Sequence, residues 1–485
     1  MAINNLAQNV IQAVNDFNGI KNSIVQKGID IPIGTKTSEY AGKISRLKKD
    51  EVNWLNVDYT GAISTNAKGL DSVYEHSNGQ DLYFYCTSNL PDALGIWQVN
   101  REEKICRQIY EIGYNWTSFF EASDGRLYVS ASNSSSLGIV CITGSEALQI
   151  YETGYYWGNK YEARDGNIYC SSNLSSQPGL LKLSPLEGVQ IFTEGYAWKF
   201  IEGINSYVYC GADNSSSTGV LSIKDGIVTR VHNETYNWIN LFAAKNGDVY
   251  ISSNLSGTNG ILYLKDGVAT KIYSSTPNWR YFYENAAGYV YMSNGSTNSG
   301  IVSAKDGVAT KIISVGDDYR YYYERENGDI YVTGDTADMV YIKNNVATVV
   351  LNMSASGYFR YYFETSSGHL YVANSSTGLS YGIYYLNEAA AEKIYSGGSA
   401  WRAFFESSNG DVYTGSSNNS TLSYGCGILK LTGNIAEQIF TAGLYWYYPI
   451  EKDGYVYFMN KSTANRNNFI LRVQGNTAEE IFLTT

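Results

Sequence analysis

Residues 114–154 read YNWTSFFEASDGRLYVSASNSSSLGIVCITGSEALQIYETG, and this stretch decides the fold. Its apolar runs are short and are separated by turn residues, at 116–121, 127–129, 138–140 and 148–151. Between the first two runs stands Asp124-Gly125, a pair that supplies the positive φ of a tight hairpin turn. A Ser/Asn loop, 132–136, separates the second run from the third. The stretch therefore predicts four short antiparallel strands joined in sequence.

This unit recurs along the chain. An aliphatic residue followed by Tyr marks each copy, with the Tyr at positions 83, 128, 169, 209, 250, 291, 331, 371, 413 and 457. The first turn recurs as Asn78-Gly79, Asp165-Gly166, Asn246-Gly247, Asn327-Gly328, Asn409-Gly410 and Asp453-Gly454. The second turn recurs as Asp225-Gly226, Asp266-Gly267 and Asp306-Gly307. Ten copies at a period near 41 residues identify a repeat protein.

Four antiparallel strands in about 41 residues is the size of a propeller blade. The sequence predicts an all-β fold, a single large β-propeller of about ten four-stranded blades over residues 51–485. An open superhelix is the competing arrangement, but a closed ring protects the sheet edges. Two five-bladed rings are the other alternative. The absence of a Pro- or Gly-rich linker in the middle favours one ring.

Composition excludes several function classes. The chain has 45 Tyr and 47 Gly among 485 residues and a formal net charge of −11, with its basic residues scattered. We therefore expect no binding to nucleic acid or to an anionic membrane. No run of 18 apolar residues could span a bilayer, and the first residues lack a signal-peptide pattern, so folding in the cytoplasm is expected. Cys170 and Cys210 follow the repeated Tyr directly, which favours buried thiols over disulfides or a metal site.

Residues 1–50 differ from the repeats and predict a short α-helical module. Apolar residues alternate at spacings of three and four, at Ile3, Leu6, Val10, Ala13, Phe17, Ile20 and Ile24. This is a heptad seam, which needs a partner helix. The partner is either another copy of the chain or a helix capped by Thr37. We favour a homo-oligomer, with a trimer as one form of it.

The segments KNSIVQKG (21–28) and IPIGTKTSEYAGKI (31–44) resemble a segment common in tail-fibre and baseplate proteins. Those proteins belong to phages, prophages and phage-tail-like bacteriocins of Gram-positive bacteria. The resemblance implies that the N-terminus, Tyr40 included, docks on other tail or baseplate proteins and that the distal domain meets the host. It also implies a place in the virion, at the tail tip or baseplate, after assembly in the bacterial cytoplasm. The repeats match no propeller family of known function.

Catalytic motifs are missing from the sequence. There is no nucleophile elbow, phosphate-binding loop, zinc-binding helix or dinucleotide fingerprint, and the three histidines, 76, 232 and 369, belong to different repeats. A Glu ends the first strand of nearly every repeat: Glu75, Glu121, Glu162, Glu202, Glu284, Glu324, Glu364, Glu406 and Glu451. Repetition at one position is not an acid–base pair. We interpret these residues as bonding the backbone near a turn or pairing across blades, and we expect neither an enzyme nor a cofactor or metal.

Four consecutive repeats add an arginine to this strand. Arg280, Arg320, Arg360 and Arg402 each stand four residues before the repeated Glu. Residues i and i+4 of a strand share a face, so we interpret these side chains as ion pairs between neighbouring blades. The functional alternative is a basic sector that contacts an anionic polymer such as a teichoic acid.

Topology gives a second candidate site. In a blade, the loop between the second and third strands and the connection to the next blade emerge at the same end. That end gathers Tyr114, Asn133, Tyr155, Asn173, Tyr196, Asn214, Tyr236 and Asn254. Tyr, Asn, Ser and Gly are the residues of binding loops, although turn formation and packing explain them as well. The seven tryptophans at 116, 157, 198, 238, 279, 401 and 446 are interpreted as blade packing.

The leading hypothesis is a receptor-binding component of a phage tail or tail-like particle that recognises a host surface glycan or protein. The alternative is a structural tail or baseplate protein whose contacts are all within the virion. An enzyme that degrades envelope polysaccharide is the third hypothesis, disfavoured because no acid–base constellation is present.

Overall fold

The computed structural model of the chain describes residues 70–86, 94–100, 105–133, 137–176, 178–212, 219–234, 237–253, 260–274, 279–294, 300–315, 319–334, 338–351, 359–374, 382–396, 401–416, 427–441, 446–460 and 469–482. The predicted helical module therefore lies outside the described residues, together with Leu6, Val10, Phe17, Ile20, Ile24 and Tyr40.

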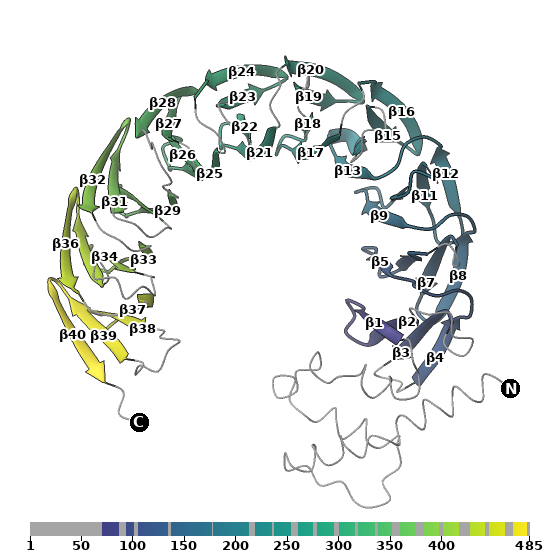
Figure 1. Cartoon of the computed structure of the whole chain (residues 1–485), viewed down its shortest axis with the longest axis horizontal. Helices are drawn as coiled ribbons and strands as arrows, with labels where there is room; N and C mark the ends of the chain where they lie inside the picture. Colours follow the sequence, from purple (N-terminus) through teal and green to yellow (C-terminus); the bar gives the residue numbers. More distant parts are fainter. Residues whose placement is uncertain are drawn as a thin grey trace, which may run out of the picture. The chain divides into compact units, whose positions relative to one another are not determined.

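Ten four-stranded antiparallel sheets follow one another along the chain, each with its strands paired in sequence order (Figure 1). Each sheet takes all four strands from one repeat, so each sheet is one complete blade. The predicted ten four-stranded blades are confirmed. The chain divides into two compact units, Met1–Leu241 with Lys265–Ala269, and Phe242–Leu264 with Thr270–Thr485, and each unit is described by itself below.

The first unit holds blades 1 to 4. Their strands are β1 (Leu70–Glu75), β2 (Asp81–Cys86), β3 (Ile96–Asn100), β4 (Ile105–Tyr110), β5 (Ser118–Glu121), β6 (Leu127–Ser130), β7 (Ile139–Thr143), β8 (Glu146–Tyr151), β9 (Trp157–Glu162), β10 (Ile168–Ser172), β11 (Leu180–Leu183), β12 (Gly188–Phe192), β13 (Trp198–Glu202), β14 (Val208–Ala212), β15 (Val220–Lys224) and β16 (Ile227–His232). A short 3₁₀ turn, η1 (Ile204–Ser206), joins the first two strands of blade 4.

Blade 5 is divided between the units, and blades 6 to 10 belong to the second. Blade 5 is β17 (Trp238–Ala243), β18 (Val249–Ser253), β19 (Gly260–Lys265) and β20 (Val268–Ser274). The later blades are β21 (Trp279–Glu284), β22 (Val290–Asn294), β23 (Ile301–Lys305), β24 (Val308–Ile313), β25 (Tyr319–Glu324), β26 (Ile330–Gly334), β27 (Met339–Lys343), β28 (Val346–Leu351), β29 (Phe359–Glu364), β30 (Leu370–Asn374), β31 (Gly382–Asn387), β32 (Ala390–Ser396), β33 (Trp401–Glu406), β34 (Val412–Ser416), β35 (Ile428–Thr432), β36 (Ile435–Phe440), β37 (Trp446–Lys452), β38 (Tyr455–Asn460), β39 (Phe469–Gln474) and β40 (Thr477–Phe482).

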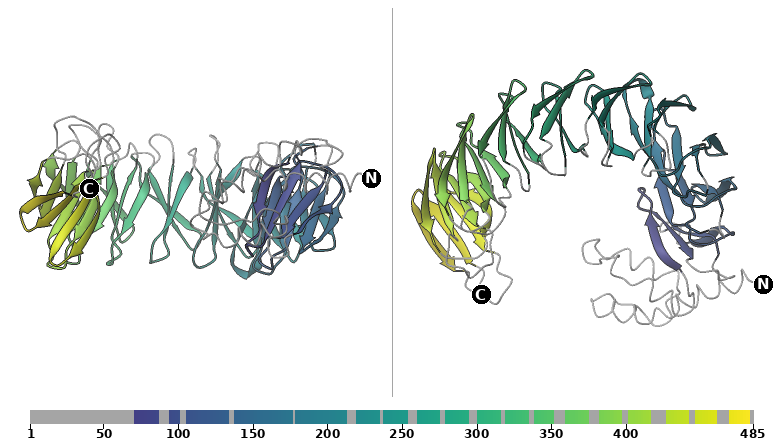
Figure 2. Two further views of the ribbon diagram at one scale, coloured as in Figure 1. Left: turned by 90° about the horizontal axis from the view of Figure 1, so that it is seen from below. Right: turned by 45° about the horizontal axis from the view of Figure 1, so that its top comes forward.

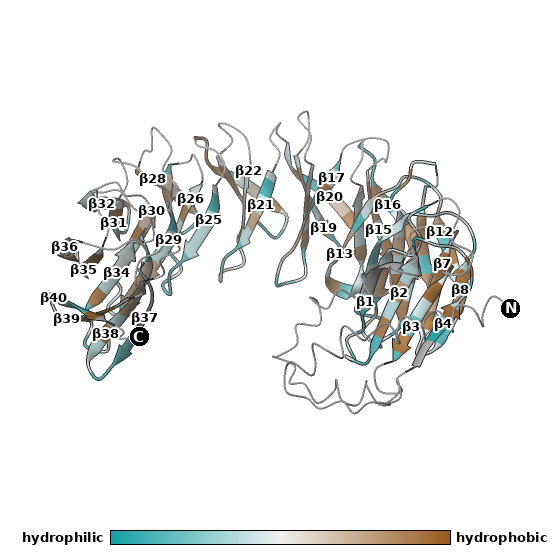
Figure 3. Cartoon of the chain, turned by 60° about the horizontal axis from the view of Figure 1, so that its bottom comes forward, coloured by the Kyte–Doolittle hydropathy of each residue, from teal (hydrophilic) through white to brown (hydrophobic). Residues whose placement is uncertain are grey.

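Burial differs systematically among the four strands of a blade. The second strand is buried at every position in β6, β10, β14 and β18, whereas the fourth strand alternates exposed and half-buried residues, as in β16 and β24. The first strand begins with a buried aromatic residue and is otherwise mostly half-buried, as in β25. The sheets can be followed in two further views in Figure 2, and Figure 3 shows apolar residues concentrated along their strands. The middle strands therefore form the core.

The two turns of a blade differ in geometry. In the first turn only the glycine has positive φ, as at Gly125, whose amide donates to Ala122 O at 2.9 Å. In the second turns made by an Asp-Gly pair both residues have positive φ, as at Asp225 (53°) and Gly226 (81°). The sequence predicted positive φ from the Asn-Gly or Asp-Gly pair at both turns. Among the first turns, Asp453-Gly454 of blade 10 also has two positive φ values, 53° and 74°.

Hydrophobic cores lie between successive blades. Tyr128 of blade 2 and Trp157 of blade 3 belong to one buried cluster, and Tyr413 of blade 9 and Trp446 of blade 10 belong to another. The predicted packing role of the tryptophans is confirmed, because all seven are at most 2% exposed. Cys170 and Cys210 are buried free thiols, as expected, and so is Cys141. Burial raises the pKa of the Cys170 thiol to about 12.

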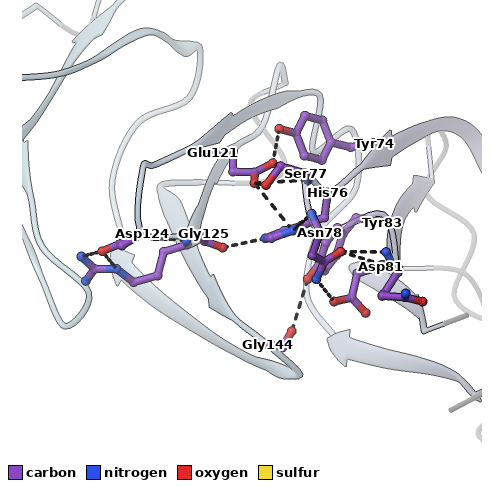
Figure 4. A network of polar contacts seen from close by, with 12 residues as sticks. Tyr74, His76, Ser77, Asn78, Asp81, Tyr83, Glu121, Asp124, Gly125 and Gly144 are labelled. Carbon is purple, nitrogen blue, oxygen red and sulfur yellow. Dashed lines mark hydrogen bonds and ion pairs between the residues drawn. The ribbon is translucent and has the colours of Figure 1, made fainter. Parts of the chain in front are cut away.

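The repeated glutamate fastens blades 2 to 4 and 6 to 10 to the turn of the blade before them. Glu121 accepts from the Ser77 amide at 3.1 Å, from the Ser77 hydroxyl and from Tyr74 Oη at 3.0 Å (Figure 4). Equivalent bonds reach backbone amides two residues past the preceding blade's first strand, at 2.7 to 2.9 Å: Glu162 to Ser123, Glu202 to Arg164, Glu284 to Lys245, Glu324 to Ala286, Glu406 to Ser366 and Glu451 to Ser408. The sequence left open whether these glutamates bond the backbone near a turn or pair across blades, and these contacts do both. We call this set the glutamate clamps.

In several blades the tyrosine that marks the repeat makes a contact in the opposite direction. Its hydroxyl reaches the second turn of the following blade, where Tyr331 Oη donates to Glu388 O at 2.9 Å and Tyr371 Oη donates to Gly433 O at 3.0 Å. Tyr83 makes the same contact with Gly144 O at 3.3 Å in the first unit. A phenylalanine would fill the same core but would leave this carbonyl without its donor.

Candidate functional site

Blades 2 to 4 carry a continuous surface at the end where the Ser/Asn loops emerge. We call it the loop face and define it as Gly113–Asn115, Ala131–Asn133, Gly154–Tyr156, Ser172–Asn173 and Gly195–Ala197. Backbone hydrogen bonds join these segments within a blade, from Ser132 N to Asn115 O and from Asn173 N to Tyr156 O, both at 2.9 Å. Others join successive blades, from Tyr156 N to Ala131 O at 2.8 Å and from Ala197 N to Ser172 O at 2.6 Å.

The structure thus brings together the two kinds of segment that topology placed at one end of a blade. Tyr114, Asn133, Tyr155 and Tyr196 are half-buried and Asn173 is exposed on this surface. The Asn133 side-chain amide also donates to Tyr114 O at 3.3 Å. Asn214, Tyr236 and Asn254, which the sequence analysis grouped with them, lie outside the described residues.

A second surface lies on the first strands of blades 6 to 9. Arg280, Arg360 and Arg402 are exposed and Arg320 is half-buried. The guanidinium carbon of Arg320 lies 4.9 Å from the ring centroid of Tyr281 in the preceding blade. The same relation holds for Arg360 over Tyr321 at 4.9 Å and for Arg402 over Tyr361 at 5.3 Å. We call these residues the arginine–tyrosine row.

The predicted ion pairing of these arginines with the repeated glutamates stays a prediction. Arginine and glutamate do share the side that faces the preceding blade, as the strand period predicted, but their described partners differ. Glu324 accepts from the Ala286 amide and from Tyr283 Oη, both at 2.9 Å. Glu364 accepts from Tyr323 Oη at 3.0 Å and pairs with Arg325 rather than with Arg360. Arg320, Arg360 and Arg402 contact the preceding blade by cation–π stacking.

The glutamate clamps also bear on catalysis. Each of these carboxylates is occupied by donors of the neighbouring turn, and the hydrogen bonds from Ser77 lower the pKa of Glu121 despite its partial burial. A general acid needs the opposite shift. In the part of the chain that the structure describes, no group of three or more His, Cys, Asp or Glu side chains is placed to hold a metal ion. No helix within the described ranges is long and apolar enough to cross a membrane.

Lys160 breaks the repeat pattern. In register it stands opposite Cys170, where several other blades place an aromatic residue such as Phe119, Phe200 or Tyr362. Its ammonium donates to Trp157 O at 2.8 Å, to the Ser118 hydroxyl at 2.9 Å and to the Ser118 carbonyl and the Ser130 hydroxyl at 3.0 Å each. Desolvation lowers its pKa to about 8. Tyr362 Oη makes a similar contact with Thr333 at 3.3 Å, which favours a structural role.

Sequence reasoning missed the tyrosines of the arginine–tyrosine row and one tyrosine of the loop face. Tyr281, Tyr321 and Tyr361 stack on the arginines but were hidden in an aromatic strand. Tyr156 lies directly after the predicted Tyr155 and is more exposed, at 41%. The repeat itself contained a signal, because the equivalents of Tyr156 in the neighbouring repeats are Asn115 and Ala197. An exposed aromatic residue at a position that otherwise holds a small or polar one marks a local departure from the repeat.

Comparisons with known proteins add little to this picture. No family model and no curated protein matches the chain. Similar solved structures include the extracellular domain of the one-component system BT4673 from B. thetaiotaomicron, 13% identical over 86% of this chain and 60% of that one, with a TM-score of 0.25. PorZ, a surface component of the type-IX secretion system of Porphyromonas gingivalis, is 11% identical over 83% and 67%, with a TM-score of 0.25.

The tricorn protease is 12% identical over 85% of this chain and 44% of that chain, with a TM-score of 0.23. The chain spans less than two thirds of the length of the BT4673 domain and of the tricorn protease. TM-scores this low carry no argument, and the fold assignment rests on the ten sheets themselves.

Proposed function

We propose that this chain is a host-recognition protein of a phage tail or tail-like particle, binding a cell-surface glycan or protein through its blades. The observation that carries the proposal is the loop face, where hydrogen bonds between blades hold a row of accessible Tyr and Asn side chains on a rigid scaffold. Rigid aromatic area with adaptable amide groups is the chemistry of binding loops. The tail setting is supported by the N-terminal resemblance.

The test is binding of labelled full-length protein to a panel of Gram-positive cells, before and after the wall polymers are stripped. The expected result is saturable binding to a few strains, lost on stripping and weakened at least tenfold in a Tyr155→Ala/Tyr196→Ala variant. Leu148→Ala, an exposed residue on outer strand β8, is the matched control. If the protein binds none of the strains, including one that the particle infects, the recognition role is contradicted.

A structural tail or baseplate protein is the second candidate, favoured by one observation on blade 10. Tyr448, Ile450 and Met459 are 66%, 54% and 39% exposed. In blade 9 the register equivalent of Ile450 is Phe405, which is half-buried. Exposed apolar residues on one blade suit contact with another protein of the particle. Ile450→Asp should then block incorporation into particles while leaving cell binding by the free protein unchanged.

A further inference from the structure

Tyr156 is held in a backbone conformation that disfavours it. Its φ is 57°, in the left-handed region, which costs a residue with a Cβ atom and is adopted most readily by Gly, Asn and Asp. The equivalent residues Asn115 and Ala197 have φ values of 58° and 53°. The loop face therefore requires this conformation in all three blades, and only blade 3 places an aromatic residue there.

The surroundings hold this backbone from both sides. The Tyr156 amide donates to Ala131 O of blade 2, and the Tyr156 carbonyl accepts from the Asn173 amide of its own blade, at 2.8 and 2.9 Å. The ring does not recover the cost by burial, because the residue is 41% exposed. Its described ring contact is with Tyr155, whose centroid lies 5.4 Å away with the planes tilted by 50°. The protein therefore presents this ring to solvent at a cost in backbone strain.

Groups around the ring indicate the chemistry of its ligand. Asn173 is exposed beside the platform, and its side-chain amide offers both a donor and an acceptor. Glu111 and Glu152 are exposed in the adjoining segments of blades 2 and 3, and their carboxylates repel an anionic ligand. The ligand that suits this site has an apolar ring face that can stack on tyrosine, hydroxyls that can bond an amide, and no negative charge. A neutral sugar has all three properties.

We propose that Tyr156, with Tyr155 beside it, is a stacking platform for a neutral sugar ring, and that Asn173 bonds its hydroxyls. This rests on the proposed recognition function and names the ligand class and the central residue of the loop face. The arginine–tyrosine row of the second unit has the opposite charge character and is not part of this site.

The decisive variant is Tyr156→Asn, which removes the ring and relieves the backbone. Its thermal unfolding midpoint should rise, and its affinity for a panel of neutral hexose oligosaccharides, measured by titration calorimetry, should fall at least tenfold. Ser206→Asn is the matched control, because it relieves the same left-handed conformation, with a φ of 57°, in the first turn of blade 4 and outside the loop face. It should raise the midpoint and leave affinity unchanged. Tyr156→Phe, which keeps the ring, should retain affinity within about threefold.

Each alternative outcome has a distinct meaning. If Tyr156→Asn lowers the unfolding midpoint, the ring is a packing residue and the inference is overturned. If wild type binds cells and Tyr156→Asn binds them equally, the platform is overturned while the recognition role stands. If protease treatment of the cells abolishes binding, the ligand is a protein and not a sugar. If wild type binds no cells but binds a hexose oligosaccharide through Tyr156, the platform stands and the recognition role fails.

Discussion

One carboxylate in each clamp replaces the water that would otherwise solvate an exposed turn. In Glu121→Gln, one acceptor oxygen becomes a donor that faces the hydroxyls of Ser77 and Tyr74, so we expect unfolding at neutral pH to become easier by about 1.5 kcal/mol. The pKa of Glu121 is lowered in the folded protein from its ordinary value of 4.5. Its contribution is therefore present above that value and is lost as the pH falls below it.

Urea unfolding of both proteins at neutral pH and at about pH 3.5 measures this difference. The difference in the free energy of unfolding between wild type and Glu121→Gln should be smaller at the lower pH. Glu146→Gln, which changes an exposed carboxylate of the same blade, should alter the free energy of unfolding at neither pH. A gap that is equal at both pH values would show that the clamp acts through shape rather than charge.

The buried ammonium of Lys160 has the opposite pH signature. Its pKa is lowered from 10.5 to about 8 in the folded protein, so between these values the unfolded chain binds a proton that the folded chain has released. Stability should therefore rise with pH through that window. Lys160→Phe restores the aromatic residue of the other blades. It should remove this slope and raise the free energy of unfolding at pH 7 by about 1 kcal/mol.

Denaturation midpoints between about pH 7 and 9.5 test this prediction without reaching the range where tyrosines ionise. Lys245→Gln, at an exposed position, should keep the wild-type slope. A slope that survives in Lys160→Phe would assign it to another group.

Two glycines with similar φ, one in blade 6 and one in blade 9, have very different surroundings. At Gly300, which precedes β23, an added Cβ would lie 1.9 Å from Ile313 O, whereas at Gly410 no atom lies within 4 Å. Both have positive φ, 72° and 85°. Gly410→Ala should cost about 1 kcal/mol from backbone strain alone. Gly300→Ala must also displace the end of β24, so its cost should exceed about 3 kcal/mol. Chemical denaturation of the two variants measures the loss in free energy of unfolding for each. Equal losses would contradict the steric argument.

Elements were the most predictable level of this protein. The aliphatic-Tyr pairs fall in the second strands, the repeated Glu ends the first strands, and Gly125 makes the expected turn, because strand period and turn chemistry are local properties. The direction of the clamps was not predictable from one repeat. Whether Glu121 bonds its own turn or that of blade 1 depends on the stagger between blades, which no local pattern encodes.

At the scale of the whole chain, repetition predicted the number of blades because each repeat closes one sheet by itself. It also placed the loop segments and Gly-Tyr segments of the loop face at one end, since that follows from strand order alone. The chemistry of the loop face and of the arginine–tyrosine row could be predicted only in part from the sequence. Cation–π stacking of Arg320 on Tyr281 requires a side-chain geometry between repeats, and the exposure of Tyr156 depends on a backbone angle.

In a chain of net charge −11, the arginine–tyrosine row is basic, whereas the segments beside the loop face carry glutamates. The arginines of the row lie on consecutive blades, and stacking on tyrosine limits the entropy that a guanidinium loses on binding an anion. The row should therefore bind a linear polyanion such as polyphosphate.

The logarithm of that affinity should fall linearly with the logarithm of salt concentration, as counterions are released. Arg360→Ala/Arg402→Ala should weaken binding at low salt at least tenfold and make the slope shallower. Lys245→Ala/Lys311→Ala removes the same charge from exposed positions outside the row and should leave both nearly unchanged. Equal losses in the two double variants would mean that only net charge attracts the polymer, and that the stacked arginines serve cohesion between blades.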